Sequence, residues 1–185
     1  MSESGENRIS QRPKRKIYDD NLHAHFVTFS CFKRRRLLNP DRAKAIVIGN
    51  LHAQLRKRNG LCAGFVIMPD HVHAIVWFPQ PKQLSGFMNK WKDQSSAAIK
   101  QLFAASFPAY WATLDATDGV WQPKYYAFNI YTRKKLDEKL DYMHKNPVEE
   151  GLVQRAVDYR WSSARWHILL TPVGIPIHCP PGLED

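Results

Sequence analysis

Residues 61–78, LCAGFVIMPDHVHAIVWF, decide how the rest of the chain is arranged. Two runs rich in β-branched and aromatic residues, 61–68 and 71–78, flank a short break at Pro69 and Asp70. Runs of this length and composition predict strands, and a break this short lets the two strands pair as an antiparallel hairpin. We therefore expect residues 61–78 to form a β-hairpin.

The elements predicted on either side of the hairpin complete a fold pattern. Before it lie a predicted strand at residues 23–30 and a predicted helix between residues 40 and 60, whose apolar side chains recur every four residues. After it come a predicted helix at 84–103, a loop at 104–119, a strand at 122–130 and a helix at 132–145 that Pro147 stops. The first six elements follow the order of the ferredoxin-like split βαβ fold. We therefore predict the α+β class, with an antiparallel sheet and an extra C-terminal helix that carries Tyr142.

The composition limits the partners of the chain. It has 185 residues, with 27 Lys and Arg against 17 Asp and Glu, and a formal net charge of +10. An excess of this size predicts a polyanionic partner, and nucleic acid is the leading candidate. A hydrophobic fraction of 44% is enough for a packed core, which excludes wholesale disorder.

The chain is expected to be one cytoplasmic domain with a segment on either side. No apolar run approaches the roughly 18–20 residues that span a bilayer, and residues 1–20 do not resemble a signal peptide. The three cysteines never have the spacing Cys-x-x-Cys, which argues against a disulfide framework and a zinc ribbon. We expect a disordered basic arm at residues 1–20, a domain at 21–166 and a Pro-rich tail at 167–185.

His71 and His73 are the first candidates for chemistry. Residues two apart on a strand point to the same face, so the two imidazoles would lie side by side, with Val72 on the other face. Two neighbouring imidazoles can bind one divalent metal ion and leave coordination positions open for a substrate. Spacing alone does not exclude two structural histidines, because His23 and His25 on the first strand have the same spacing.

Tyr142 and Asn146 are the second candidate pair. They are four residues apart on the last predicted helix and therefore lie on the same face, one turn apart. A tyrosine phenol can act as a covalent nucleophile, and an amide carbonyl is a hard oxygen ligand that suits Mg²⁺ or Mn²⁺. The alternative is that Tyr142 packs on the sheet and that Asn146 ends the helix before Pro147.

The candidates for nucleic-acid contacts are basic and aromatic side chains. Basic side chains hold phosphates, and aromatic side chains stack on unpaired bases. The candidates are Arg34, Arg35, Arg36, Lys90, Trp91, Lys92, Trp121 and Tyr125. Each has an ordinary alternative, since most tryptophans belong to the core and most charged runs face solvent.

Four motifs, in this order, resemble one known family. They are MPDHVHAIV at 68–76, WQPKYY at 121–126, DYMHKNPV at 141–148 and WSS at 161–163. Together they resemble the REP-associated tyrosine transposases, an insertion-sequence transposase-like group of the single-tyrosine HUH superfamily, where HUH stands for His, a hydrophobic residue and His. The resemblance covers residues 21–166, so this range is expected to be an HUH transposase-like domain.

The resemblance implies a role for each matching residue. His71 and His73 match the pair that binds a divalent cation, Mg²⁺ or Mn²⁺, and Asp70 is a candidate for orienting a ligand. Tyr142 matches the tyrosine that attacks a phosphodiester and forms a 5′-phosphotyrosine, and Asn146 stands where an amide side chain completes the metal site. The implied function is a transposase or nickase that cleaves and rejoins single-stranded DNA beside a hairpin of a palindromic repeat. It would act as a monomer or a homodimer.

Three other functions compete with this one. A non-catalytic DNA- or RNA-binding protein that retains the fold has no use for His71, His73 and Tyr142 together. A relaxase or replication initiator is disfavoured by the short, single-domain length. A phosphoesterase of the paired His-x-Thr or His-x-Ser type is disfavoured because the chain lacks that pair of motifs.

Overall fold

The computed structural model describes residues 21–115 and 117–184, so the arm predicted at residues 1–20 lies outside the described residues. Four antiparallel strands form one sheet in the order β2-β3-β1-β4. They are β1 (Ala24–Ser30), β2 (Leu61–Ile67), β3 (His71–Trp77) and β4 (Tyr126–Ile130). The predicted α+β class and the antiparallel sheet are confirmed, and the strand order is the ferredoxin-like one.

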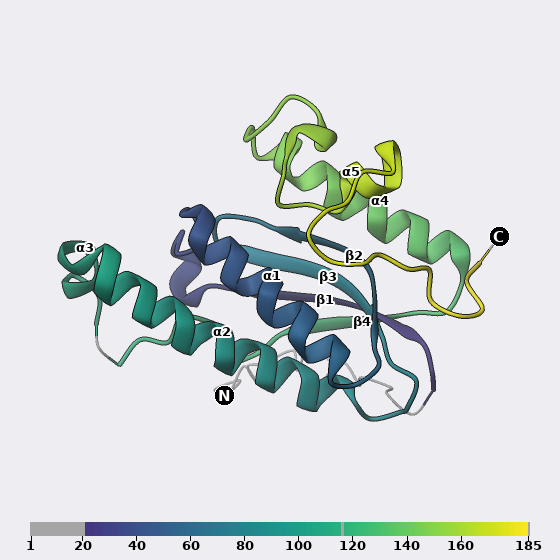
Figure 1. The fold of residues 1–185 in the computed structure, drawn as a ribbon, viewed down its shortest axis with the longest axis horizontal. Coiled ribbons are helices and arrows are strands. Elements are labelled where there is room, and N and C mark those ends of the chain that lie inside the picture. Colours follow the sequence, from purple (N-terminus) through teal and green to yellow (C-terminus); the bar gives the residue numbers. More distant parts are fainter. Residues whose placement is uncertain (1–20, 116, 185) are drawn as a thin grey trace, which may run out of the picture.

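Helices cover both faces of this sheet. On one face, α1 (Asp41–Arg56) and α2 (Leu84–Ser106) lie side by side, and on the other lie α4 (Arg133–Glu149) and the short α5 (Ala164–Leu169), as Figure 1 shows. Side chains alternate between the faces along each strand, so the sheet has two cores. No helix in the described part of the chain is both long enough and apolar enough to cross a membrane.

The loop predicted at residues 104–119 contains a helix that the sequence analysis missed. This helix, α3 (Pro108–Ala112), begins with a proline, which suits the first turn because its missing N–H has no partner there anyway. Tyr110 and Trp111 pack against Phe103 of α2, with ring centroids 5.8 and 5.9 Å apart. Contacts between aromatic rings of α2 and α3 therefore stabilise α3. This helix is too short to show a clear periodic pattern in the sequence.

The predicted stop of the last helix at Pro147 is wrong, because α4 continues to Glu149. A proline lacks the N–H that would bond to the carbonyl four residues earlier. The backbone N–H of Glu150 still donates to the carbonyl of Asn146 at 2.9 Å. One missing bond in the last turn does not end the helix.

The chain after α4 covers the outer edge of β2. After a 3-10 turn, η2 (Ala156–Asp158), the carbonyl of Trp161 accepts a hydrogen bond from the N–H of Ile67 at 2.9 Å. Farther on, the N–H of His178 donates to the carbonyl of Cys62 at 2.9 Å. The boundary predicted at residue 166 falls inside α5, and the following residues pack along this edge of the domain.

Candidate functional site

Strand β3 places His71 and His73 on the sheet face that α4 covers. The register pairs His73 with Thr28 of β1, and Thr28 in turn with Tyr126 of β4. The two imidazole centroids lie 4.8 Å apart, and both side chains are buried. The structure therefore brings the predicted histidine pair together, as the two-residue spacing on a strand requires.

The second His-x-His pair lies elsewhere. His25 pairs in the sheet with Val76, which belongs to the core under α1 and α2. The Nδ1 atom of His25 is 3.1 Å from the side-chain oxygen of Asn129. His25 thus faces away from the site, toward the core under α1 and α2.

Both site histidines bond to the protein through Nδ1. His71 Nδ1 lies 2.7 Å from Oδ1 of Asp70, and His73 Nδ1 lies 2.7 Å from Oγ1 of Thr28. When Nδ1–H donates to an oxygen, the lone pair sits on Nε2, which is the atom a metal ion needs. His73 Nε2 is buried and has no hydrogen-bond partner in the described part of the chain.

The surroundings keep His73 neutral. Burial lowers its pKa to about 3, and electrostatic interactions with His71, Arg34 and Lys139 act in the same direction. A neutral imidazole with an unpartnered buried nitrogen fits a divalent cation. No group of three or more His, Cys, Asp or Glu side chains within residues 21–115 and 117–184 is arranged to hold a metal ion, so the other ligands would be an amide, water or phosphate oxygen.

Asp70 connects His71 to the basic loop. Its second carboxylate oxygen forms an ion pair with Nε of Arg34 at 2.8 Å. Arg34 also donates a hydrogen bond to Oγ of Ser30 at 3.0 Å. Arg34 ends a 3-10 turn, η1 (Phe32–Arg34), with a φ of 55°, a left-handed conformation that few non-glycine residues adopt. This geometry fits the orienting role that the resemblance implies for Asp70.

Helix α4 carries Tyr142 to the same place. Its ring centroid lies 5.5 Å from that of His73 and 6.1 Å from that of Phe26, with the ring tilted by 71° and 73° to them. The side chain is 49% exposed, so a large substrate can reach it. The structure therefore brings the predicted nucleophile beside the histidine pair.

Asn146 lies one turn farther along α4 and is buried. Its Nδ2 donates to the backbone carbonyl of Tyr142 at 3.0 Å, and it makes no hydrogen bond to His71 or His73. This bond uses the amide nitrogen and leaves Oδ1 as the atom that a metal ion would bind. Its role as a ligand stays a prediction.

The position of α4 depends on Gly64, which sequence reasoning missed. A bulge in β2 between Cys62 and Gly64 turns Gly64 toward the helix. An added Cβ there would lie 2.6 Å from Cδ2 of Leu140 and closer still to Cε of Met143. The absent side chain lets α4 lie this close to the strand while Leu140 and Met143 keep their positions, and a lone glycine inside a predicted strand was the available signal.

His144 and the WSS motif form a second attachment of α4. His144 Nε2 lies 2.8 Å from Oγ of Ser163, which accepts a hydrogen bond from the N–H of Phe65 at 2.9 Å and lies 3.2 Å from the Phe65 carbonyl. The single hydroxyl proton goes to that carbonyl, so His144 is the donor of its bond. Burial lowers the pKa of His144 to about 3, with a contribution from the charge of His167. A neutral imidazole thus ties the helix that carries Tyr142 to β2.

Two predicted base-stacking residues belong to the core instead. Trp91 is fully buried, and its Nε1–H donates to the carbonyl of Val47 at 2.9 Å. Trp121 is 6% exposed, and its Nε1–H donates to Oγ of Ser95 at 3.0 Å. Both rings pack edge-on with Phe29, at 4.8 and 4.7 Å. An enclosed indole offers no surface to a base, so the prediction is wrong for both.

The candidates near α2 also have structural roles. The ammonium of Lys92 donates to the backbone carbonyls of Gln122 and Pro123 at 2.7 and 2.8 Å, so it fastens the loop before β4, and its contact with DNA stays a prediction. The strand predicted at residues 122–130 is shorter than expected, since β4 begins at Tyr126. Tyr125 is half-buried against the core under α1 and α2, whereas Lys90 is exposed.

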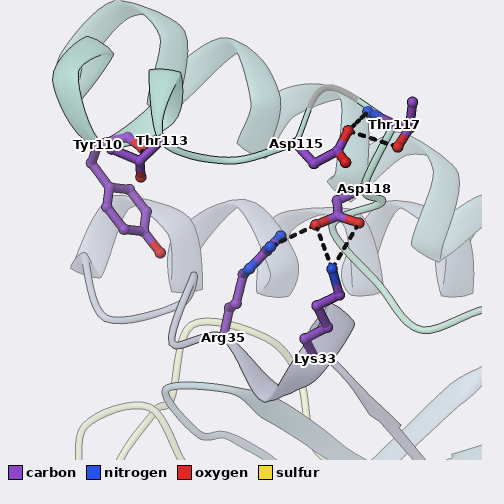
Figure 2. A network of polar contacts seen from close by, with 7 residues as sticks. All are labelled: Lys33, Arg35, Tyr110, Thr113, Asp115, Thr117 and Asp118. Atoms are coloured by element: carbon purple, nitrogen blue, oxygen red, sulfur yellow. Dashed lines mark hydrogen bonds and ion pairs between the residues drawn. The ribbon is translucent and has the colours of Figure 1, made fainter.

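The basic loop is partly neutralised. Asp118 forms ion pairs with both Lys33 and Arg35, so the loop after α3 is fastened to the basic loop, as Figure 2 shows. Arg34 is paired with Asp70, as described above. Arg36 is exposed, and its contact is a long one of 3.5 Å with the side chain of Asn39. Among the three predicted arginines, Arg36 is therefore the one without a carboxylate partner in the described part of the chain.

A family model described as "Transposase IS200 like" matches residues 19–146, a range that includes the histidine pair and Tyr142. The chain belongs to this IS200-like transposase family. The resemblance drawn from four motifs is thereby confirmed. Within the family, it is 25% identical over 99 residues to the REP-associated tyrosine transposase of Escherichia coli strain K12, which covers 54% of this chain and 51% of that protein.

A second relative, from Haemophilus influenzae, is 26% identical over 103 residues, or 52% of this chain and 54% of its own length. The chain thus spans about half the length of the curated relatives it matches. Among solved structures, a REP-associated tyrosine transposase bound to a REP hairpin has a TM-score of 0.67 at 20% identity. The match covers 95% of this chain and 98% of that one, and it shows that the two share a fold.

Proposed function

We propose that the chain cuts and rejoins single-stranded DNA beside a hairpin, with Tyr142 as the nucleophile. The observation that carries this proposal is the meeting of Tyr142 with the histidine pair, at 5.5 Å between the Tyr142 and His73 rings. Membership of a transposase family and a net charge of +10 support DNA as the substrate. The hairpin is proposed by analogy with the REP hairpin bound to the structural relative.

The proposed metal site consists of Nε2 of His71, Nε2 of His73 and Oδ1 of Asn146. A divalent cation held there, Mg²⁺ or Mn²⁺, would polarise a non-bridging oxygen of the scissile phosphate. Asp70 and Thr28 hold the two rings through Nδ1, which fixes the direction of both Nε2 lone pairs. The rings are thus oriented before any substrate arrives.

Tyr142 makes and later breaks the covalent bond. Its phenol oxygen attacks phosphorus, the bond from phosphorus to the 3′ oxygen breaks, and that oxygen leaves as a hydroxyl with the proton that the phenol gives up. The products are a 5′-phosphotyrosine and a free 3′-hydroxyl. Attack by the 3′-hydroxyl of another strand reverses the step and joins new ends, so the exchange needs no ATP.

A cleavage assay tests the proposal. Labelled hairpins with single-stranded flanks, drawn from palindromic repeats, are incubated with the protein and Mg²⁺ or Mn²⁺ and separated on a denaturing gel. A nicked strand and a protein–DNA adduct are expected, and both should disappear with EDTA and in Tyr142→Phe. Tyr131→Phe is the matched control, because Tyr131 is also an exposed tyrosine.

Two outcomes would contradict the proposal. An adduct that persists in Tyr142→Phe would assign the nucleophile to another tyrosine. Hairpin binding without any product, with either metal, would indicate a non-catalytic binding protein.

A further inference from the structure

Aromatic side chains extend from the histidine pair toward β4. One row of the sheet runs from His73 through Thr28 to Tyr126, and the adjacent row pairs Phe26 with Phe128. Because side chains two apart on a strand share a face, Tyr126 and Phe128 lie on the same face as His73. Tyr126 is 36% exposed and packs edge-on against Phe26, with centroids 6.5 Å apart.

Lys139 of α4 holds its ammonium over these rings. Its Nζ lies 5.0 Å from the centroids of Phe26 and Phe128 and 5.8 Å from that of Tyr142. Lys135, one turn earlier, forms an ion pair with Glu138 at 2.6 Å. For Lys139, by contrast, no carboxylate of the described residues is within ion-pair distance.

The charge of Lys139 acts on the proposed catalytic centre. Both Lys139 and Arg34 act electrostatically on the position of His73. The two cations come from different elements, η1 and α4, and they also differ in the groups that neutralise their charge. Arg34 forms an ion pair with Asp70, whereas the ammonium of Lys139 lies over aromatic rings and has no carboxylate of the described residues within ion-pair distance.

We propose that Tyr126, Phe128 and Lys139 form a subsite for the unpaired nucleotide beside the scissile phosphate. Lys139 contacts the phosphate of that nucleotide, and the two rings offer their surface to its base. A cation without a carboxylate partner next to exposed aromatic surface is the combination that binds single-stranded nucleic acid. The subsite rests on the proposed function, since it takes Tyr142 as the attacking group.

The subsite can be tested separately from cleavage, by measuring binding to DNA that contains no hairpin. The probes are a single-stranded oligothymidylate of about 15 nucleotides and a duplex of the same length, without metal. Tyr126→Ala is expected to weaken single-strand binding by about five- to 150-fold, the range for the loss of one stacked base. Tyr126→Phe keeps the ring and should bind like the unmodified protein.

The charge of Lys139 is tested through salt. Lys139→Met should lower the slope of log affinity against log salt for the single strand by about 0.7, because one phosphate contact is lost. The matched control is Lys134→Met, which removes the same charge from an exposed position of α4. Duplex affinity should stay unchanged in all variants, and thermal melts check that each one is folded.

The outcomes separate the subsite from the proposed function. Equal losses on single strand and duplex, or the same effect for Lys134→Met as for Lys139→Met, would overturn the subsite. Unchanged single-strand binding in Tyr126→Ala would overturn it as well. An adduct that survives in Tyr142→Phe overturns the proposed nucleophile, and it does so without altering these binding results.

Discussion

Replacing Gly64 by alanine is expected to displace the helix that carries Tyr142. The added Cβ would lie 2.6 Å from Cδ2 of Leu140 and 3.1 Å from Oγ of Ser163, and closer still to Cε of Met143. Carbon atoms in contact normally lie about 3.5–4.0 Å apart. Met143 is fully buried and cannot swing out into solvent, whereas Leu140 borders a cavity and has some room to move. The clash is therefore expected to move α4 by on the order of 1 Å.

The effect on activity should exceed the effect on stability. Overpacking of a core costs about 1–3 kcal/mol, which for a chain of this size lowers the melting temperature by roughly 2–12 °C. A displacement of about 1 Å at a reacting group can slow a reaction by about 100-fold. The variant should thus be folded at 25 °C and yet form the tyrosine–DNA adduct far more slowly.

Thermal unfolding and the rate of adduct formation measure the two effects. Gly49→Ala is the matched control, because no atom lies within 4 Å of an added Cβ at this position in α1. Alanine is the better helix former by about 1 kcal/mol, so this control should melt higher than the unmodified protein. An unchanged melting temperature and rate in Gly64→Ala would refute the reasoning. A lower melting temperature with an unchanged rate would show that the packing of α4 on β2 does not determine the position of Tyr142.

Three further predictions test the site and the core. Asp70→Asn should weaken Mn²⁺ binding by about 10- to 100-fold, measured by calorimetric titration, because a neutral amide holds His71 less firmly; equal affinity would contradict the orienting role. His144→Gln keeps a donor for Ser163 but removes a group whose pKa falls to about 3 on folding. Protonation of this histidine favours the unfolded state, so the unmodified protein should lose up to about 1.4 kcal/mol per pH unit more than the variant between pH 6.5 and 3 in urea denaturation; parallel curves would argue against a buried neutral imidazole. Trp91→Phe should cost about 1–3 kcal/mol of unfolding free energy and leave oligothymidylate binding unchanged, whereas weaker binding by the folded variant would restore the base-stacking role.

The fold was predictable because its signals are local. Strand-forming runs on either side of Pro69 and Asp70 predict a hairpin without knowledge of distant residues. The two-residue spacing of His71 and His73 likewise predicts a shared face, because the alternation of a strand allows nothing else. For Tyr142, the helical pattern alone did not predict proximity to the histidines. That proximity was predicted from the order of the four motifs, because members of one family share the arrangement of their site residues.

Burial and partner choice were not predictable, because they depend on contacts between distant segments. Trp91 and Lys92 are neighbours in a basic, aromatic stretch typical of a nucleic-acid surface, yet one is in the core and the other fastens a loop. Which of them faces solvent is determined by how α2 packs on α1 and on the loop before β4. The same holds for Lys139, whose three ring contacts come from β1, β4 and its own helix.

The covered edge of β2 has a consequence for the synthesis of the chain. An edge strand with unpaired N–H and C=O groups is a template on which another strand can add. Residues 161–178, which occupy this edge, are translated after all four strands of the sheet. During translation there is thus an interval in which the sheet can form while one of its edges is still open to another nascent chain. That interval ends when the WSS motif reaches β2, so we expect chains that lack this motif to aggregate more readily as they are made.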